Sequence, residues 1–147
     1  MTAKELLAAY AVGDRNFIGV DLGGVDLSGA DLFRADLSGA NLSGANLSGA
    51  DCFGADLRSA NLRGAKLSSA NFSGVDLTMA NLSDANLNYA NLHGANLSGA
   101  NLSGADFFGA DLRSANLRGA DLSDADLSGA NLSGVILRWA DFSWAKF

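Results

Sequence analysis

The chain contains no proline, one cysteine and one histidine among its 147 residues. A single cysteine excludes an internal disulfide framework, so nothing in the sequence points to an oxidising compartment. The first residues contain no long apolar run, and Glu5 interrupts the only leucine-rich segment there. We therefore expect neither a signal peptide nor a membrane-spanning helix, and we expect the protein to be cytoplasmic.

Positive charge is also scarce. Lys and Arg together number 10 against 16 Asp and Glu, which gives a formal net charge of −6. Nucleic acids and anionic membranes are bound through basic patches, so this balance argues against direct binding to either. An acidic surface suits solubility or a basic protein partner.

The residue combinations of catalysis and metal binding are missing as well. His93 has no second His and no Cys near it, and the many serines have no base beside them that could activate a hydroxyl. No glycine motif of the phosphate-binding P-loop kind occurs. We therefore predict that the protein is not an enzyme and that it has no catalytic residue, no metal site and no cofactor.

What the sequence does contain is a repeat of five residues. A large apolar residue recurs at every fifth position from Phe17 to Phe147, which makes 27 repeats. Each of these central residues is Leu or Phe except Cys52, which we interpret as a buried thiol without chemistry because its equivalent in a near-identical later segment is Phe107. From Val20 onward, Ala or Val stands two positions before each centre, and Asp or Asn usually stands directly before it.

A period of five fits neither a continuous strand nor a helix. In a strand, Leu42 and Leu47 would point to opposite faces, because alternate side chains do so. In a helix, five residues turn the side-chain direction by about 140°, which would spread the leucines around the axis. The pattern instead predicts a short extended piece followed by a bend in every repeat. Ser-Gly suits that bend, since Gly tolerates positive φ and Ser bonds its own backbone, so the chain is predicted to be a solenoid.

Tandem units of the form Ala-(Asp/Asn)-Leu-Ser-Gly resemble the pentapeptide repeat family, and the resemblance covers residues 16–147. It implies a right-handed quadrilateral parallel β-helix with four repeats per coil and about seven coils. The central residue and the Ala two before it would lie inside and fill the lumen, leaving no pore and no ligand cavity. The expected fold is therefore an all-β solenoid formed by residues 14–147.

Residues 1–13 lie outside the repeat and are expected to form a short capping helix. Thr2 and Glu5 fit a capping box, in which the two side chains satisfy backbone donors at the start of the helix. The apolar residues that follow stand at helical spacing: Leu6, Leu7, Tyr10 and Ala11. Gly13 can take the left-handed conformation that ends a helix. This segment resembles the plug on some family members, and it would cover the first coil, whose open edge would otherwise invite pairing with another chain.

With four repeats per coil, residues twenty apart lie above one another. Asp36, Asp56 and Asp76 would then form a candidate interaction face, whereas the neighbouring face carries asparagines. Like charges about 5 Å apart repel by roughly 0.8 kcal/mol in a water-like dielectric, which an exposed face tolerates. Two interpretations stay open: solvated edge residues in which Asp and Asn interchange, or a row of charge that imitates the phosphates of DNA.

Aromatic residues crowd into the last coil, and no helix follows to cover it: Trp139, Phe142, Trp144 and Phe147. Either they fold over the end of the core, or they form an end-to-end interface with a second molecule. We favour a homodimer through the C-terminal coil, because Trp139 and Trp144 occupy outward positions usually held by Gly, and exposed aromatic residues are typical of interfaces.

These features predict a non-enzymatic, rigid interaction or scaffold protein that presents flat, acidic β-helix faces to a macromolecular partner. The family resemblance implies an alternative. The members that mimic DNA, bind DNA gyrase and give quinolone resistance are acidic rods that dimerise through the C-terminal end. This chain shares the acidity and the apolar C-terminus but lacks their C-terminal dimerising helix.

Overall fold

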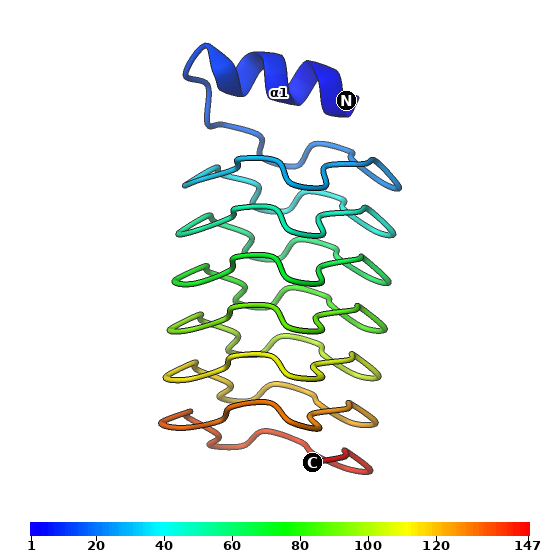
Figure 1. The fold of residues 1–147 in the computed structure, drawn as a ribbon, viewed down its shortest axis with the longest axis vertical. Helices are drawn as coiled ribbons and strands as arrows, with labels where there is room; N and C mark the ends of the chain where they lie inside the picture. Colours follow the sequence, from blue (N-terminus) through cyan, green and yellow to red (C-terminus); the bar gives the residue numbers. More distant parts are fainter.

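In the computed structural model, which describes all 147 residues, one α-helix lies on a tall stack of coils (Figure 1). The helix, α1, spans Ala3–Ala11. The coils are joined by single-residue parallel β-bridges between residues twenty apart, from Asn16↔Asp36 to Asp126↔Lys146. One coil therefore contains four pentapeptides. We number its sides by their first central residues, so that face 1 begins with Phe17, face 2 with Leu22, face 3 with Leu27 and face 4 with Leu32.

Every repeat ends in the same tight turn. In the turn from Leu27 to Ala30, the N–H of Ala30 donates to the carbonyl of Leu27 at 3.1 Å, and Gly29 has φ +66. A positive φ at the third residue of such a turn defines type II. The same position has positive φ in every turn from Gly19 to Trp144. Ten of these positions are not glycine: Arg34, Ser59, Ser69, Met79, Asp84, Tyr89, Ser114, Asp124, Trp139 and Trp144.

Backbone hydrogen bonds hold successive coils together. The N–H of Leu37 donates to the carbonyl of Asp56 at 2.8 Å in the next coil, and the N–H of Asp56 donates to the carbonyl of Ala35 at 2.9 Å in the previous one. This pattern recurs along the stack. Because each coil pairs with both neighbours, only the two ends of the solenoid leave backbone groups to be satisfied in another way.

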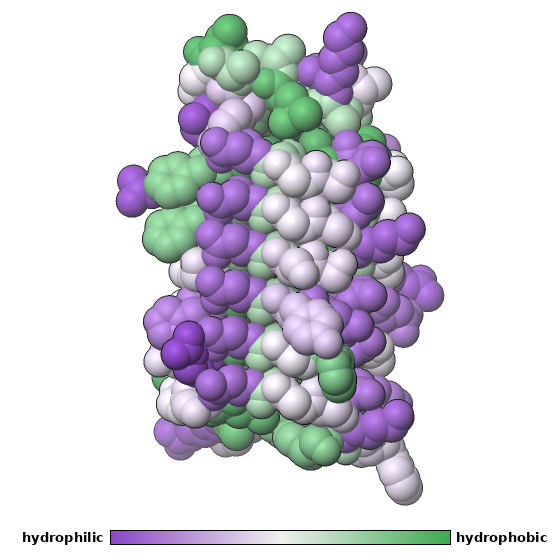
Figure 2. Space-filling model, viewed as in Figure 1, coloured by the Kyte–Doolittle hydropathy of each residue, from purple (hydrophilic) through white to green (hydrophobic).

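The interior is a single apolar column of side chains. It consists of 44 buried residues, nearly all of them the central Leu or Phe of a repeat or the Ala two positions before it, and no polar or charged residue is buried. Cys52 is fully buried among them, and burial raises the pKa of its thiol to about 12. On the face shown in Figure 2, hydrophilic columns run along the stack beside columns of intermediate hydropathy, and hydrophobic side chains lie at the two ends and in a few projections.

The predicted capping box is present at the start of α1. The Oγ1 atom of Thr2 accepts from the N–H of Glu5 at 3.2 Å, and the Oε2 atom of Glu5 accepts from the N–H of Thr2 at 2.7 Å. At the other end, Gly13 has φ +97, and its N–H donates to the carbonyl of Tyr10 at 3.0 Å. The N–H of Asp14 donates to the carbonyl of Ala9 at 3.1 Å, which completes a Schellman motif.

Helix α1 meets the first coil through Leu6, through the partly buried Ala3, Ala9 and Tyr10, and through polar contacts. Leu6 is fully buried, whereas Leu7, which the helical spacing placed on the same face, is 38% exposed. Adjacent helix residues point about 100° apart, so only one of the two can face the coil. The Tyr10 hydroxyl donates to Asp31 Oδ1 at 3.0 Å and to the carbonyl of Phe33 at 3.1 Å. At nine residues, α1 is too short to span a lipid bilayer, and the structure contains no other helix.

Candidate interaction surfaces

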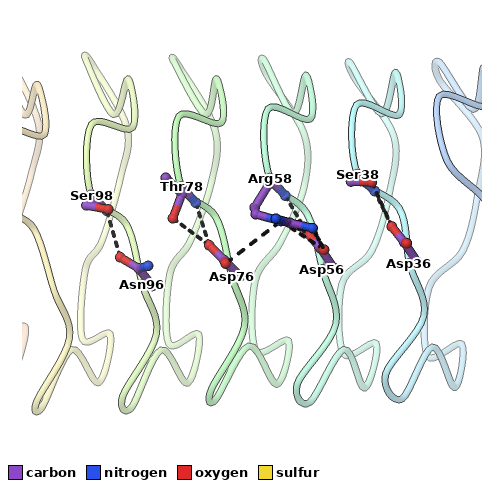
Figure 3. A network of polar contacts seen from close by, with 8 residues as sticks. All are labelled: Asp36, Ser38, Asp56, Arg58, Asp76, Thr78, Asn96 and Ser98. Atoms are coloured by element: carbon purple, nitrogen blue, oxygen red, sulfur yellow. Dashed lines mark hydrogen bonds and ion pairs between the residues drawn. The ribbon is translucent and has the colours of Figure 1, made fainter.

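Face 1 stacks Asp36, Asp56 and Asp76 on consecutive coils, as the twenty-residue spacing predicts (Figure 3). We call these three residues the acidic column. The Oδ1 atom of each accepts the N–H of the residue two positions later, at 3.1, 3.0 and 3.0 Å. The hydroxyls of Ser38 and Thr78 donate to Asp36 and Asp76 as well, at 2.7 and 2.6 Å. The bend therefore fixes the direction of each carboxylate.

The asparagine columns are built differently. On face 2, Asn41 Nδ2 donates to Asp21 Oδ1 at 2.7 Å in the previous coil, and Asn61 Nδ2 donates to Asn41 Oδ1 at 3.3 Å. An ionised aspartate has no donor, so it cannot make this bond. An asparagine can thus link its coil to the previous one through its side-chain amide. The acidic column is the longest run of aspartates on any face, because the others stack at most two.

Arg58 partly neutralises the acidic column. Its Nη2 atom lies 2.5 Å from Asp56 Oδ2 and its Nε atom lies 4.0 Å from Asp76 Oδ2. Hydrogen bonding to this guanidinium lowers the pKa of Asp56. Three carboxylates and one guanidinium leave a charge of −2. This pairing was not predicted from the sequence, although Asp-Leu-Arg was a usable signal, since Arg113 pairs with Asp111 at 2.6 Å in the same way.

The four C-terminal aromatic residues do not form one patch. Phe142 and Phe147 lie together at the end of the stack, with ring centroids 5.6 Å apart. Trp139 lies on the side of the solenoid, where the Cζ atoms of Arg118 and Arg138 are 4.5 and 4.4 Å from its ring centroid. Trp144 is 87% exposed. The structure thus separates an apolar end from a basic aromatic cluster on face 1.

The end of the last coil exposes residues of the kind that are buried elsewhere. Leu137 is 40% exposed and Phe147 is 71% exposed, because no further coil packs on them. The N–H groups of Leu132, Leu137 and Phe142 also make no backbone hydrogen bond, whereas the equivalent groups of earlier coils donate to the next coil. This end therefore combines apolar side chains with free backbone donors.

Both surface hollows of the molecule lie along face 1. They measure about 460 and 450 Å³ and share Thr78 and Met79 as lining residues. Arg58 lines the first hollow and Arg118 lines the second.

No group of three His, Cys, Asp or Glu side chains is arranged to hold a metal ion. The side chain of the exposed His93 makes no hydrogen bond.

Comparison with known proteins agrees with this architecture. The protein-family model for pentapeptide repeats matches residues 16–49, 50–88, 76–113 and 110–147. A trypsin-treated form of QnrB1, a plasmid-mediated fluoroquinolone resistance protein, is similar in fold, with 26% identity, 90% of this chain and 84% of that chain covered, and a TM-score of 0.67. A pentapeptide repeat protein from the Arabidopsis thaliana thylakoid lumen is 37% identical, with 74% and 72% covered and a TM-score of 0.55. No curated protein matches the chain by sequence. The predicted family is confirmed: the chain belongs to the pentapeptide repeat family and is a right-handed β-helix solenoid.

Proposed function

We propose that this protein is a rigid, non-catalytic interaction protein whose acidic column binds a basic surface on a macromolecular partner. The stack of Asp36, Asp56 and Asp76 in register is the observation that carries the proposal. Their Oδ1 atoms are used by the bend, whereas Asp36 Oδ2 accepts no hydrogen bond and remains available to a partner. Because a packed core and a fixed bend hold each carboxylate on backbones that are about 4.8 Å apart at ordinary strand spacing, little side-chain entropy is lost when a partner binds.

Affinity capture with matched variants tests this proposal. Replacing the acidic column with asparagine removes the charge but retains the Oδ1 acceptor that each bend needs. The control replaces three aspartates of face 2 in the same way: Asp21, Asp121 and Asp141. A specific partner should be retained by the wild type and the control but lost by the acidic-column variant. If no bound protein distinguishes the two variants, the acidic column is not the binding surface.

A second candidate is a DNA-mimicking role at DNA gyrase, of the kind that gives quinolone resistance. The similarity to QnrB1 over most of both chains supports it, together with the acidic column and the net charge of −6. The test is DNA supercoiling by purified gyrase, with and without a fluoroquinolone, at micromolar concentrations of this protein. This role requires that the protein inhibits supercoiling by gyrase or protects gyrase from the fluoroquinolone, and that the acidic-column variant does neither. A complete lack of effect would reject gyrase but leave the broader proposal standing.

The end of the last coil is proposed to form an end-to-end homodimer contact. Two observations support this contact: the side chains of Leu137 and Phe147 are exposed, and N–H groups of this coil make no backbone hydrogen bond. Exposed apolar surface and unpaired backbone donors both favour association with a second molecule. Light scattering should then give twice the chain mass. Phe147→Glu and Trp144→Glu should each reduce the mass to that of one chain, whereas a monomeric wild type would refute the contact.

A further inference from the structure

Arg118 and Arg138 lie one coil apart on face 1, and the chain supplies neither of them with a carboxylate. Arg58, earlier in the same column, pairs with the aspartate two residues before it. The corresponding residues here are Asn116 and Ile136, which carry no charge. Neither arginine forms an ion pair with any other residue. Two guanidinium groups are therefore left without the partner that Arg58 has.

The nearest aspartates along the chain do not neutralise these arginines. Asp121 and Asp141 follow Arg118 and Arg138 by three residues and lie on face 2. The Oδ1 atom of each aspartate accepts the N–H and the hydroxyl of the serine two residues later, so both carboxylates are held at their own bends. This part of face 1 is thus locally basic in a protein whose net charge is −6.

Trp139 holds the two arginines together. The Cζ atoms of Arg118 and Arg138 lie 4.5 and 4.4 Å from the centroid of its ring, within the range of a cation–π contact. We call these three residues the basic cluster. Two guanidinium groups against one ring repel each other, and a bound anion relieves that repulsion. Their planar forks match a carboxylate, and held side chains lose less conformational freedom on binding than free ones.

A hollow of about 450 Å³ adjoins the basic cluster and extends from Trp139 to Met79. These two large residues occupy the same turn position three coils apart, and the two coils between them have Gly99 and Gly119 at that position. Met79 leans into the gap, since a Cβ atom on Gly99 would lie 2.5 Å from its sulfur. Arg118 lines the same hollow. One end of the hollow is therefore apolar, and the other end carries the guanidinium groups and the indole.

From this arrangement we propose that the basic cluster and the adjoining hollow bind an acidic peptide segment of a partner protein. Alternate side chains of an extended peptide lie on one side, about 7 Å apart. Because Arg118 and Arg138 lie against one ring, two carboxylates at alternate positions of such a peptide contact both of them. An apolar side chain two residues further along the peptide then enters the hollow beside Met79.

The surrounding charges favour a short acidic peptide over a nucleic acid. A nucleic acid is bound through a long basic track that follows its phosphates. Here the basic charge covers only two coils, and Asp76 stands on the same face two coils before Arg118. The proposed peptide places its uncharged side chain nearest to Asp76. The site lies outside the acidic column, so this proposal and the proposed function can fail separately.

Fluorescence polarisation of a labelled synthetic peptide tests the site. The probe has blocked ends, two glutamates at alternate positions and a leucine two residues after the second glutamate, and a matched probe has glutamines in place of the glutamates. The glutamate peptide should bind saturably, and about tenfold or more tightly than the glutamine peptide. Arg118→Gln and Arg138→Gln should each raise its dissociation constant about tenfold, as expected when a hydrogen bond to a charged group is lost.

Arg63→Gln is the matched control. Arg63 also follows an Asn-Leu pair, as Arg118 does, but it lies on face 2 and pairs with Asp84 at 3.8 Å. This variant should bind the glutamate peptide as the wild type does. The acidic-column variant should bind it at least as tightly as the wild type, which separates this site from the acidic column.

Tryptophan fluorescence locates the bound peptide. Trp144→Phe leaves Trp139 as the only tryptophan, and its emission should change with the same concentration dependence as the polarisation. Circular dichroism verifies that each variant is folded. The proposal is overturned if the glutamate peptide does not bind saturably, if the two peptides bind alike, or if neither arginine variant weakens binding. It is also overturned if a single-stranded oligonucleotide binds the basic cluster as tightly as the glutamate peptide.

Discussion

Tyr89 lies directly over Gly109, one coil further along the solenoid. A Cβ atom on Gly109 would be 2.7 Å from Cε1 of the Tyr89 ring. Met79 has the same relationship to Gly99, where a Cβ would be 2.5 Å from its sulfur. A large side chain in the left-handed position of one turn thus leans over the turn of the next coil. Glycine in these turns therefore supplies space for a neighbouring coil in addition to its backbone conformation.

This relationship predicts that Gly109→Ala destabilises the protein more than Gly119→Ala. Both glycines have φ +66, so both substitutions incur the left-handed penalty of about 1–2 kcal/mol. Only at Gly109 must a neighbour move, since nothing lies within 4 Å of a Cβ at Gly119. Urea unfolding gives the two free energies. Adding Tyr89→Ala to each variant should remove the difference, and equal losses in the single variants would contradict the contact.

Ser59→Gly is expected to stabilise the protein. Ser59 has φ +56, a strained conformation for a residue with a side chain. Relief of about 1–2 kcal/mol exceeds the roughly 0.5–1 kcal/mol of chain entropy that glycine adds to the unfolded state. The midpoint of thermal unfolding should rise. Ser43→Gly is the control. Ser43 precedes the left-handed position of its turn, and its hydroxyl donates to Asn41 Oδ1 at 2.8 Å. The unfolding midpoint of this variant should therefore fall.

Arg58→Gln is expected to destabilise the solenoid only slightly, as is typical of the loss of an exposed ion pair. The Arg58 side chain is 56% exposed, so the loss should shrink further as salt screens the repulsion between Asp56 and Asp76. Adding Asp56→Asn should restore stability, because an asparagine there can donate to Asp36 as Asn41 does to Asp21. Denaturant unfolding at low and high salt measures both effects, and a salt-independent loss would speak against repulsion within the acidic column.

Cys52 should make the protein less stable at high pH. Burial raises the pKa of its thiol from 9.0 to about 12, so between these values the unfolded chain loses a proton that the folded chain keeps. The free energy of unfolding should therefore fall by about 1.4 kcal/mol per pH unit in this window. Cys52→Ala should lack the contribution of the thiol and show a shallower slope, although it starts from a lower stability because the substitution leaves a cavity. Parallel pH profiles of the two proteins would refute the effect.

Much of this protein follows from its sequence. A five-residue period can bury Leu42 and Leu47 together only if the chain bends between them, so burial of apolar surface determines the solenoid and its inside and outside positions. The start of α1 is likewise predictable from Thr2 and Glu5, because a capping box involves only residues close together in the sequence. With twenty residues per coil, the stacking of Asp36, Asp56 and Asp76 follows by counting.

Only the tertiary structure decided what these outward residues contact. Arg58 partly neutralises the acidic column, because it pairs with Asp56 in its own repeat and reaches toward Asp76 in the next coil. Trp139 lies beside Arg118 of the previous coil rather than with Phe147. Turns without glycine also take the left-handed conformation, since coil-to-coil hydrogen bonds impose it on residues that avoid it locally. The five-residue period determines the face of the solenoid on which a side chain lies, whereas packing between coils determines which residues its polar or aromatic group contacts.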